Sequence, residues 1–220
     1  MARLARVVLP GVPHHVTQRG VRSMEIFSSD EDRRAYLSLL NEHGAKAGLK
    51  FLSYCLMNNH VHLLVIPQHE KSLREGIGET HKRYSRLVNF REQVRGHLFQ
   101  ERFFSCPLDL AHLSAAARYV ERNPVRAGIC RHAKNFSWSS ARFHLGMIDR
   151  DPLVQQSQWF GSPDDWKAYL KEESPDLEKF REHFRTGRPL GDDRFLRKAE
   201  ATTKQELNPK KPERPKKDKN

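Results

Sequence analysis

The segment that most constrains the fold is residues 49–66, where two apolar runs are separated by Asn58-Asn59. The first run, LKFLSYCLM, and the second, Val61 to Ile66, have the length and the β-branched or aromatic content of strands. Asparagine tolerates the left-handed backbone of a tight turn, and Pro67 ends the second run. The sequence therefore predicts a β-hairpin at the centre of a sheet.

The flanking segments supply the remaining layers. The patterns predict a strand at 14–19, a helix begun by a Ser28/Glu31 capping box and ended by Gly48, a helix at 72–90, a strand at 99–106, and a helix from Asp109 to Asn123-Pro124. The order strand, helix, strand, strand, helix, strand, helix indicates an α+β fold, a ferredoxin-like or RRM-like sandwich. We expect an antiparallel sheet with helices on one face, plus a C-terminal helical extension.

The charge of the chain indicates a polyanionic partner. Thirty-nine Lys and Arg against 27 Asp and Glu give a net charge of +12. Residues 1–150 carry net +10, residues 151–197 net −2, and residues 198–220 net +4. We therefore expect a nucleic-acid domain at 1–150, a helical extension at 151–197 whose acidity opposes DNA contact, and a disordered basic tail at 198–220.

The composition also excludes some classes of protein. No apolar run approaches the ~20 residues that span a bilayer. Three cysteines, widely spaced and odd in number, match neither a disulfide framework nor a CxxC zinc site. We expect reduced thiols and a cytoplasmic, nucleoid-associated protein without a membrane segment.

Two histidines share one face of the second hairpin strand. His60 and His62 flank Val61, and side chains two residues apart on a strand point the same way. Neutral imidazoles placed side by side can chelate a divalent ion. A structural pair of histidines is the alternative, and a metal site would need a third ligand from elsewhere in the fold.

The third predicted helix offers such a ligand. Tyr119 and Asn123 are four residues apart, one helical turn, on a stripe beside the apolar face. Asn123 can offer an amide oxygen to a metal, and Tyr119 would then lie beside a bound phosphate as a nucleophile. The alternatives are a half-buried tyrosine and a helix-ending asparagine before Pro124.

These motifs resemble those of a known family. The run from Leu56 to Leu64 (LMNNHVHLL) resembles the His-hydrophobic-His signature of HUH endonucleases. The run from Arg118 to Gly128 (RYVERNPVRAG) resembles the helix that bears the single tyrosine in REP-associated tyrosine transposases, of the IS200-like class. Similar stretches occur at Arg19-Gly20, at 99–103 and at 137–140, so the resemblance covers roughly residues 10 to 145.

The resemblance implies a transposase-like nuclease and strand transferase that acts on single-stranded DNA next to a REP-type hairpin, with Mg²⁺ or Mn²⁺. It implies that His60, His62 and Asn123 are metal ligands and that Tyr119 forms a 5′-phosphotyrosine. Simpler relatives use glutamine as the third ligand, and Asn123 is shorter.

Basic side chains on two helices are candidates for a phosphate track: Lys82, Arg83, Arg86, Arg118, Arg122 and Arg126. Tyr84 is a rival nucleophile, but its helical position places it in the core. A catalytically silent nucleic-acid-binding module with an RRM-like fold is the main alternative function, and a zinc hydrolase is a weaker one. The sequence leaves open whether the chain forms a homodimer.

Overall fold

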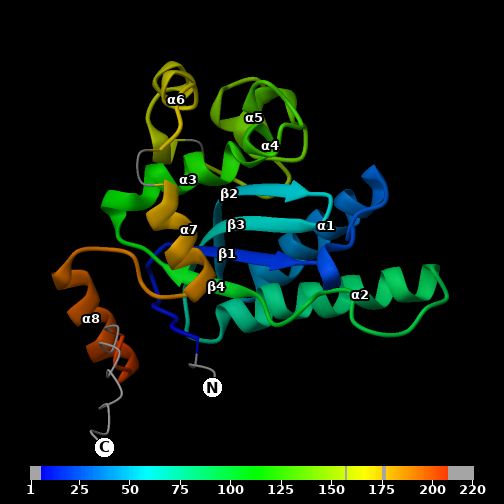
Figure 1. Cartoon of the computed structure of the whole chain (residues 1–220), viewed down its shortest axis with the longest axis horizontal. Helices are drawn as coiled ribbons and strands as arrows, with labels where there is room; N and C mark the ends of the chain where they lie inside the picture. Colours follow the sequence, from blue (N-terminus) through cyan, green and yellow to red (C-terminus); the bar gives the residue numbers. More distant parts are fainter. Residues whose placement is uncertain (1–5, 157, 175–176, 208–220) are drawn as a thin grey trace, which may run out of the picture.

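The computed structural model describes residues 6–156, 158–174 and 177–207. Its centre is an antiparallel four-stranded sheet in the order β2-β3-β1-β4. The strands are β1 (His14–Arg19), β2 (Leu49–Met57), β3 (His60–Pro67) and β4 (Phe104–Pro107). The predicted hairpin is present, because β2 and β3 pair from Met57 opposite His60 to Leu49 opposite Pro67. It places β3 inside the sheet, between β2 and β1 (Figure 1).

One face of the sheet packs on two helices. These are α1 (Asp30–Lys46) and α2 (Glu79–Arg91), and α2 continues from a π-helical turn at Arg74–Gly78. Alternate strand residues such as Val16, Val61 and Leu63 form the core on this side. Tyr84 belongs to that core as predicted, since it is fully buried and its hydroxyl donates to the Ile26 carbonyl (2.6 Å).

Helices also cover the opposite face of the sheet. The sequence predicted helices on one face, plus a C-terminal helical extension. They are α3 (Leu113–Glu121), α4 (Asn123–Arg126), α5 (Ala141–His144), α6 (Pro163–Tyr169) and α7 (Leu177–Thr186). Helix α8 (Asp193–Thr203) packs instead against the N-terminal segment of the chain. Helix α3 contacts β2 and β3, whereas α7 contacts β1 and β4 (Figure 1). The second core, which includes Leu64, Leu113 and Trp166, fills the space between these helices and the sheet.

Several element boundaries differ from the sequence predictions. Helix α1 begins after Ser29, whose side chain accepts from the Asp32 amide, while Ser28 donates to the Asp32 carboxylate. The expected strand at 99–106 pairs regularly only over Phe104–Pro107, with one isolated bridge between Gly20 and Phe99. The chain also continues past Asn123-Pro124 as α4, because proline is well tolerated in the first turn of a helix.

The C-terminal part of the chain differs from the expected tail. Residues 198–203 lie in α8, where Ala199 is buried against Val7, Leu9 and Leu207. Residues 208–220, the rest of the expected basic tail, lie outside the described residues. The expected extension is packed into the molecule, since Trp166 of α6 lies in the second core. Within the described residues, no helix has the length and apolar character needed to cross a membrane.

Candidate active site

A cavity of about 630 Å³ opens on the α3 side of the sheet. Strands β1 and β3 form its floor, and α3, α4 and α7 supply its walls. The side chains that matter for chemistry are imidazoles, a phenol, an amide and arginines: His15, His60, His62, Tyr119, Asn123, Arg19, Arg102, Arg126, Arg181 and Arg185. The structure thus brings together the four residues predicted as ligands and nucleophile.

His60 and His62 lie side by side on β3, with ring centroids 5.0 Å apart. The register places His62 between Thr17 of β1 and Cys55 of β2, so its ring points to the α3 face. Each ring has one nitrogen held by a neighbour: His60 Nδ1 by the Asn59 side-chain oxygen (2.6 Å), and His62 Nδ1 by His15 Nε2 (2.9 Å). The second nitrogen of each ring remains for a ligand.

Both imidazoles are neutral at pH 7. Burial, and secondarily the charge of Arg19, lowers the pKa of His60 to about 4. Burial, the neighbouring histidines and nearby arginines hold the pKa of His62 well below its usual value. Only neutral imidazole binds metal, so protons do not compete for these nitrogens at physiological pH.

His15 completes the histidine cluster, and sequence reasoning missed it. In the tandem His14-His15 the two side chains point to opposite faces, and His15 faces the cavity. Its ring stacks on Phe184 at 3.6 Å between centroids and contacts His62 at 5.0 Å. When His62 presents Nε2 to a cation, its Nδ1 carries the proton and donates to His15 Nε2. In that arrangement His15 accepts the proton of His62 Nδ1 and holds the orientation of the His62 ring.

Tyr119 lies on the cavity side of α3. Its ring meets His62 edge-on at 5.7 Å between centroids, and Phe184 at 5.1 Å. The guanidinium of Arg126 lies 4.1 Å from the ring centroid and donates to the Tyr119 carbonyl (2.5 Å). A positive charge over the ring favours negative charge on the phenol oxygen during a reaction.

Asn123 begins α4, directly after the break at Arg122. Its side chain is buried and lies close enough to His60 to act on the pKa of that imidazole, which it raises against the effect of burial. Within the described residues, no three His, Cys, Asp or Glu side chains gather as metal ligands. Two imidazole nitrogens and the amide oxygen of Asn123 fit a divalent cation, with coordination positions left for phosphate and water.

The predicted phosphate track is only partly at the cavity. Of its residues Arg126 lines the cavity, whereas Lys82, Arg83 and Arg86 lie on α2, against the other face of the sheet. Arg118 is buried with its guanidinium 3.9 Å from the Tyr169 ring centroid. Arg122 donates to the Leu170 (2.5 Å) and Lys171 (3.0 Å) carbonyls.

Other arginines line the cavity instead. Arg181 and Arg185 come from α7, inside the segment whose acidity was expected to oppose DNA contact. The sequence does contain a signal for this position of the arginines. Phe180 and Phe184 mark the buried face of α7, and each arginine follows one of them directly. Net charge averaged over 47 residues concealed this face.

A family model described as "Transposase IS200 like" matches residues 12–123, which is half of the chain. The chain belongs to the IS200-like transposase family. The match includes β1, the β2-β3 hairpin and α3, and it ends at Asn123. A search of curated proteins found no match to this transposase.

Two solved structures resemble this chain, and one of them supports the fold. A REP-associated tyrosine transposase bound to a REP hairpin superposes with a TM-score of 0.58 at 12% identity, covering 74% of this transposase and 96% of that chain. A provisionally named transposase from Deinococcus radiodurans has a TM-score of 0.38 at 16% identity, covering 58% and 92% of the two chains. The first match confirms the α+β fold with its four-stranded antiparallel sheet.

Proposed function

We propose that this transposase cleaves and rejoins single-stranded DNA beside a hairpin, with Tyr119 as the nucleophile. Family membership implies DNA transposition chemistry at a tyrosine. The observation that carries the proposal is the single cavity that holds the Tyr119 ring, the His60 and His62 rings and the Asn123 amide. Tyr84, the other candidate, uses its hydroxyl inside the core.

The chemistry is a transesterification. The Tyr119 oxygen attacks phosphorus and loses its proton to solvent, while the bond from phosphorus to the 3′ oxygen breaks. The products are a 5′-phosphotyrosine and a 3′-OH strand. The phosphodiester energy is retained, so a later 3′-OH can attack the phosphotyrosine and restore the tyrosine.

The surrounding residues have distinct roles. His60, His62 and Asn123 would hold a divalent cation, Mg²⁺ or Mn²⁺, which neutralises nonbridging phosphate oxygens when bound. Arg126 favours negative charge on the phenol oxygen, and Arg181 and Arg185 bind phosphates of the incoming strand. His15 holds His62 in the ligating tautomer.

The test looks for a covalent adduct between the protein and DNA. A labelled hairpin with a single-stranded flank is incubated with Mn²⁺ and protein, and the adduct is resolved on a denaturing gel. We expect an adduct with wild type and none with Tyr119→Phe. The matched control is Tyr84→Phe, which removes a phenol oxygen from the core and leaves the adduct in place.

An adduct that persists in Tyr119→Phe overturns the assignment of the nucleophile. Retained hairpin binding without an adduct, across many flank sequences and both metals, favours the alternative of a catalytically silent nucleic-acid-binding module.

A further inference from the structure

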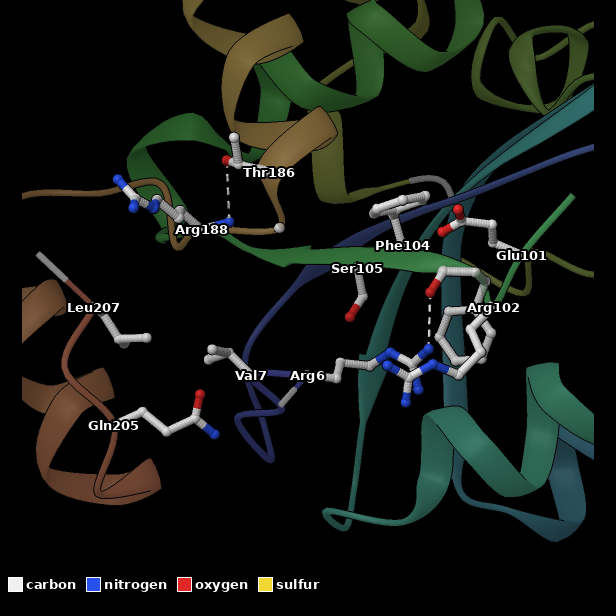
Figure 2. A pocket seen from close by; sticks show the side chains of 12 residues that line it. Arg6, Val7, Glu101, Arg102, Phe104, Ser105, Thr186, Arg188, Gln205 and Leu207 are labelled. Atoms are coloured by element: carbon white, nitrogen blue, oxygen red, sulfur yellow. Dashed lines mark hydrogen bonds between the residues drawn. The ribbon is translucent and has the colours of Figure 1, made fainter. Parts of the chain in front are cut away.

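A second cavity of about 210 Å³ lies at the free edge of the sheet, below β4. Figure 2 shows four segments around it: the N-terminal Arg6 and Val7, the chain at 101–105, the turn at Thr186–Arg188 after α7, and residues 205–207 after α8. Glu101, Arg102 and Phe104 line both this cavity and the active-site cavity. The two cavities therefore adjoin across β4, and we call the smaller one the edge cavity.

Two arginines lie side by side in the edge cavity (Figure 2). The guanidinium of Arg6 lies 3.6 Å from the Phe103 ring centroid and donates to the Phe103 carbonyl (2.8 Å). Burial and the charge of Arg102 lower the pKa of Arg6 to about 10. Three arginines, Arg6, Arg102 and Arg188, and one carboxylate, Glu101, line the cavity. This excess of positive charge favours a bound anion.

A buried hydroxyl points into the same space. Ser105 is 4% exposed, and its Oγ has no hydrogen-bond partner in the described structure. Figure 2 shows this oxygen directed from β4 toward Arg6 and Val7. Buried polar atoms are normally satisfied, so this unpartnered hydroxyl beside a cavity indicates a polar ligand.

The turn after α7 brings the chain close to β4. Gly187 has a φ of +72°, and a Cβ at this position would lie 3.1 Å from the Ser105 carbonyl oxygen. Glycine is favoured by both the backbone angle and the close approach. The wall of the edge cavity beside Ser105 is therefore fixed by backbone geometry.

We propose that the edge cavity binds a backbone phosphate of the DNA strand that occupies the active-site cavity, an inference that rests on the proposed function. The guanidinium groups of Arg6 and Arg102 and the Ser105 hydroxyl can each donate to the acceptor oxygens of a phosphate. At about 210 Å³ the cavity is smaller than the ~300–1,000 Å³ of pockets that enclose whole small molecules. It accommodates one phosphate group of a chain that continues outside. Arg102 and Phe104, shared by both cavities, mark the path of the strand over β4.

The first test is the salt dependence of binding. Tyr119→Phe protein is titrated with a labelled hairpin and its single-stranded flank at several salt concentrations, so that no covalent step contributes. In this background Arg102→Gln should flatten the slope of log K against log salt by about 0.7, the value for one phosphate on a single strand. Affinity should fall about three- to tenfold. Arg6→Gln should do the same, and Ser105→Ala should weaken binding about threefold.

The matched control is Arg95→Gln, which removes an exposed arginine outside both cavities and should leave the slope unchanged. Arg102 is exposed and has no hydrogen bond in the described structure, so its variant keeps the fold even if Arg6→Gln does not. An unchanged slope in Arg102→Gln overturns the proposal.

The second test locates the phosphate. Single neutral methylphosphonates are placed in turn along the flank, and one position should weaken wild-type binding but not the binding of Arg102→Gln. A third arm titrates inorganic phosphate and follows the Arg6 and Arg102 side-chain Nε–H signals by NMR. Shifts with phosphate, combined with no sensitive position in the DNA, would identify a free-phosphate site and overturn the DNA assignment. If wild type forms no covalent adduct but the variants show the expected changes in slope, the catalytic proposal alone is overturned.

Discussion

Helix α3 carries two polar clusters that differ in how they are hydrogen-bonded, although Tyr119 and Glu121 are two residues apart. Glu121 is fully buried, and its carboxylate is surrounded by donors. It is bonded to Ser140 Oγ (2.6 Å), Trp166 Nε1 (2.9 Å), His144 Nδ1 (2.5 Å) and Ser53 Oγ (3.3 Å). The hydrogen-bonding capacity of this carboxylate is used inside the protein.

The Tyr119 cluster is arranged in the opposite way. His60 and His62 each have one ring nitrogen held by a neighbour, and the other is left toward a cavity lined by arginines. A carboxylate whose hydrogen bonds are all made stabilises the fold, whereas imidazole nitrogens that face a cavity are available to a ligand. Both clusters contain histidine and both are buried. They differ in whether the groups that could bind a ligand already have hydrogen-bond partners.

Removal of one cavity-facing histidine should have the largest effect on adduct formation. His60→Ala should lower adduct formation by more than about 10³-fold, because a lost metal ligand removes charge neutralisation at the reacting phosphate. Hairpin affinity should change less than about threefold, since phosphate contacts supply most of the binding. Cleavage on a denaturing gel and fluorescence anisotropy measure the two quantities. The exposed His132→Ala is the control, and an equal collapse of affinity would contradict the ligand role.

Removal of the hydrogen-bonded carboxylate of Glu121 should instead reduce the stability of the fold. Glu121→Ala leaves the Trp166 and His144 donors buried without their acceptor, and we expect a loss of about 3–5 kcal/mol in the free energy of unfolding. Urea denaturation measures this loss. Adduct formation per folded molecule should stay within about threefold of wild type, and a specific loss of cleavage would show that the two clusters act together.

Acid should affect the Tyr119 cluster through its buried imidazoles. Burial and the charge of Arg126 lower the pKa of His15 to about 3, below the ~6.5 of an unfolded histidine. The unfolded chain therefore binds a proton first, and stability falls as the pH drops below about 6.5. At pH 5 the contribution of His15 is a loss of about 2 kcal/mol.

Unfolding free energies of wild type and His15→Gln, compared between pH 7 and pH 5, test this effect. The variant should lose about 2 kcal/mol less on acidification than wild type. Parallel pH profiles would show that folding leaves the pKa of His15 unchanged and would contradict this prediction.

Surface arginines and lysines should give the smallest effects, and these depend on their position. Arg185→Gln should weaken hairpin binding about three- to tenfold, because the residue lines the active-site cavity. Lys82→Gln on α2 should change it less than about twofold, since Lys82 pairs with Glu79 (3.3 Å) and lines no cavity with the site residues. Salt-dependent anisotropy measures both, and equal losses would extend the DNA-binding surface to α2.

The fold was largely predictable because its signals are local. Hairpin pairing around Asn58-Asn59 and the helical spacing of Tyr84 need no tertiary information. The pair His60 and His62 and the pair Tyr119 and Asn123 were also readable from their spacing. That all four line one cavity depends on how α3 packs on β2 and β3.

The rest of the site depends on contacts between distant segments. His15 is distinguished from His14 only by the register of β1 against β3, which sets its ring beside His62. Arg118 was predicted to bind phosphate, yet Tyr169, 51 positions later, covers it. Arg181 and Arg185 lie in an acidic stretch, and only the packing of α7 against β1 and β4 turns them toward the cavity.

The contribution of α7 has a consequence for synthesis of the protein. The stacking of Phe184 on His15 joins residues 169 positions apart, so this wall of the cavity cannot form until most of the chain has left the ribosome. A nascent chain that has already folded its sheet still lacks Arg181, Phe184 and Arg185. Under the proposed function, the part of the active site where the strand enters would thus be the last to assemble.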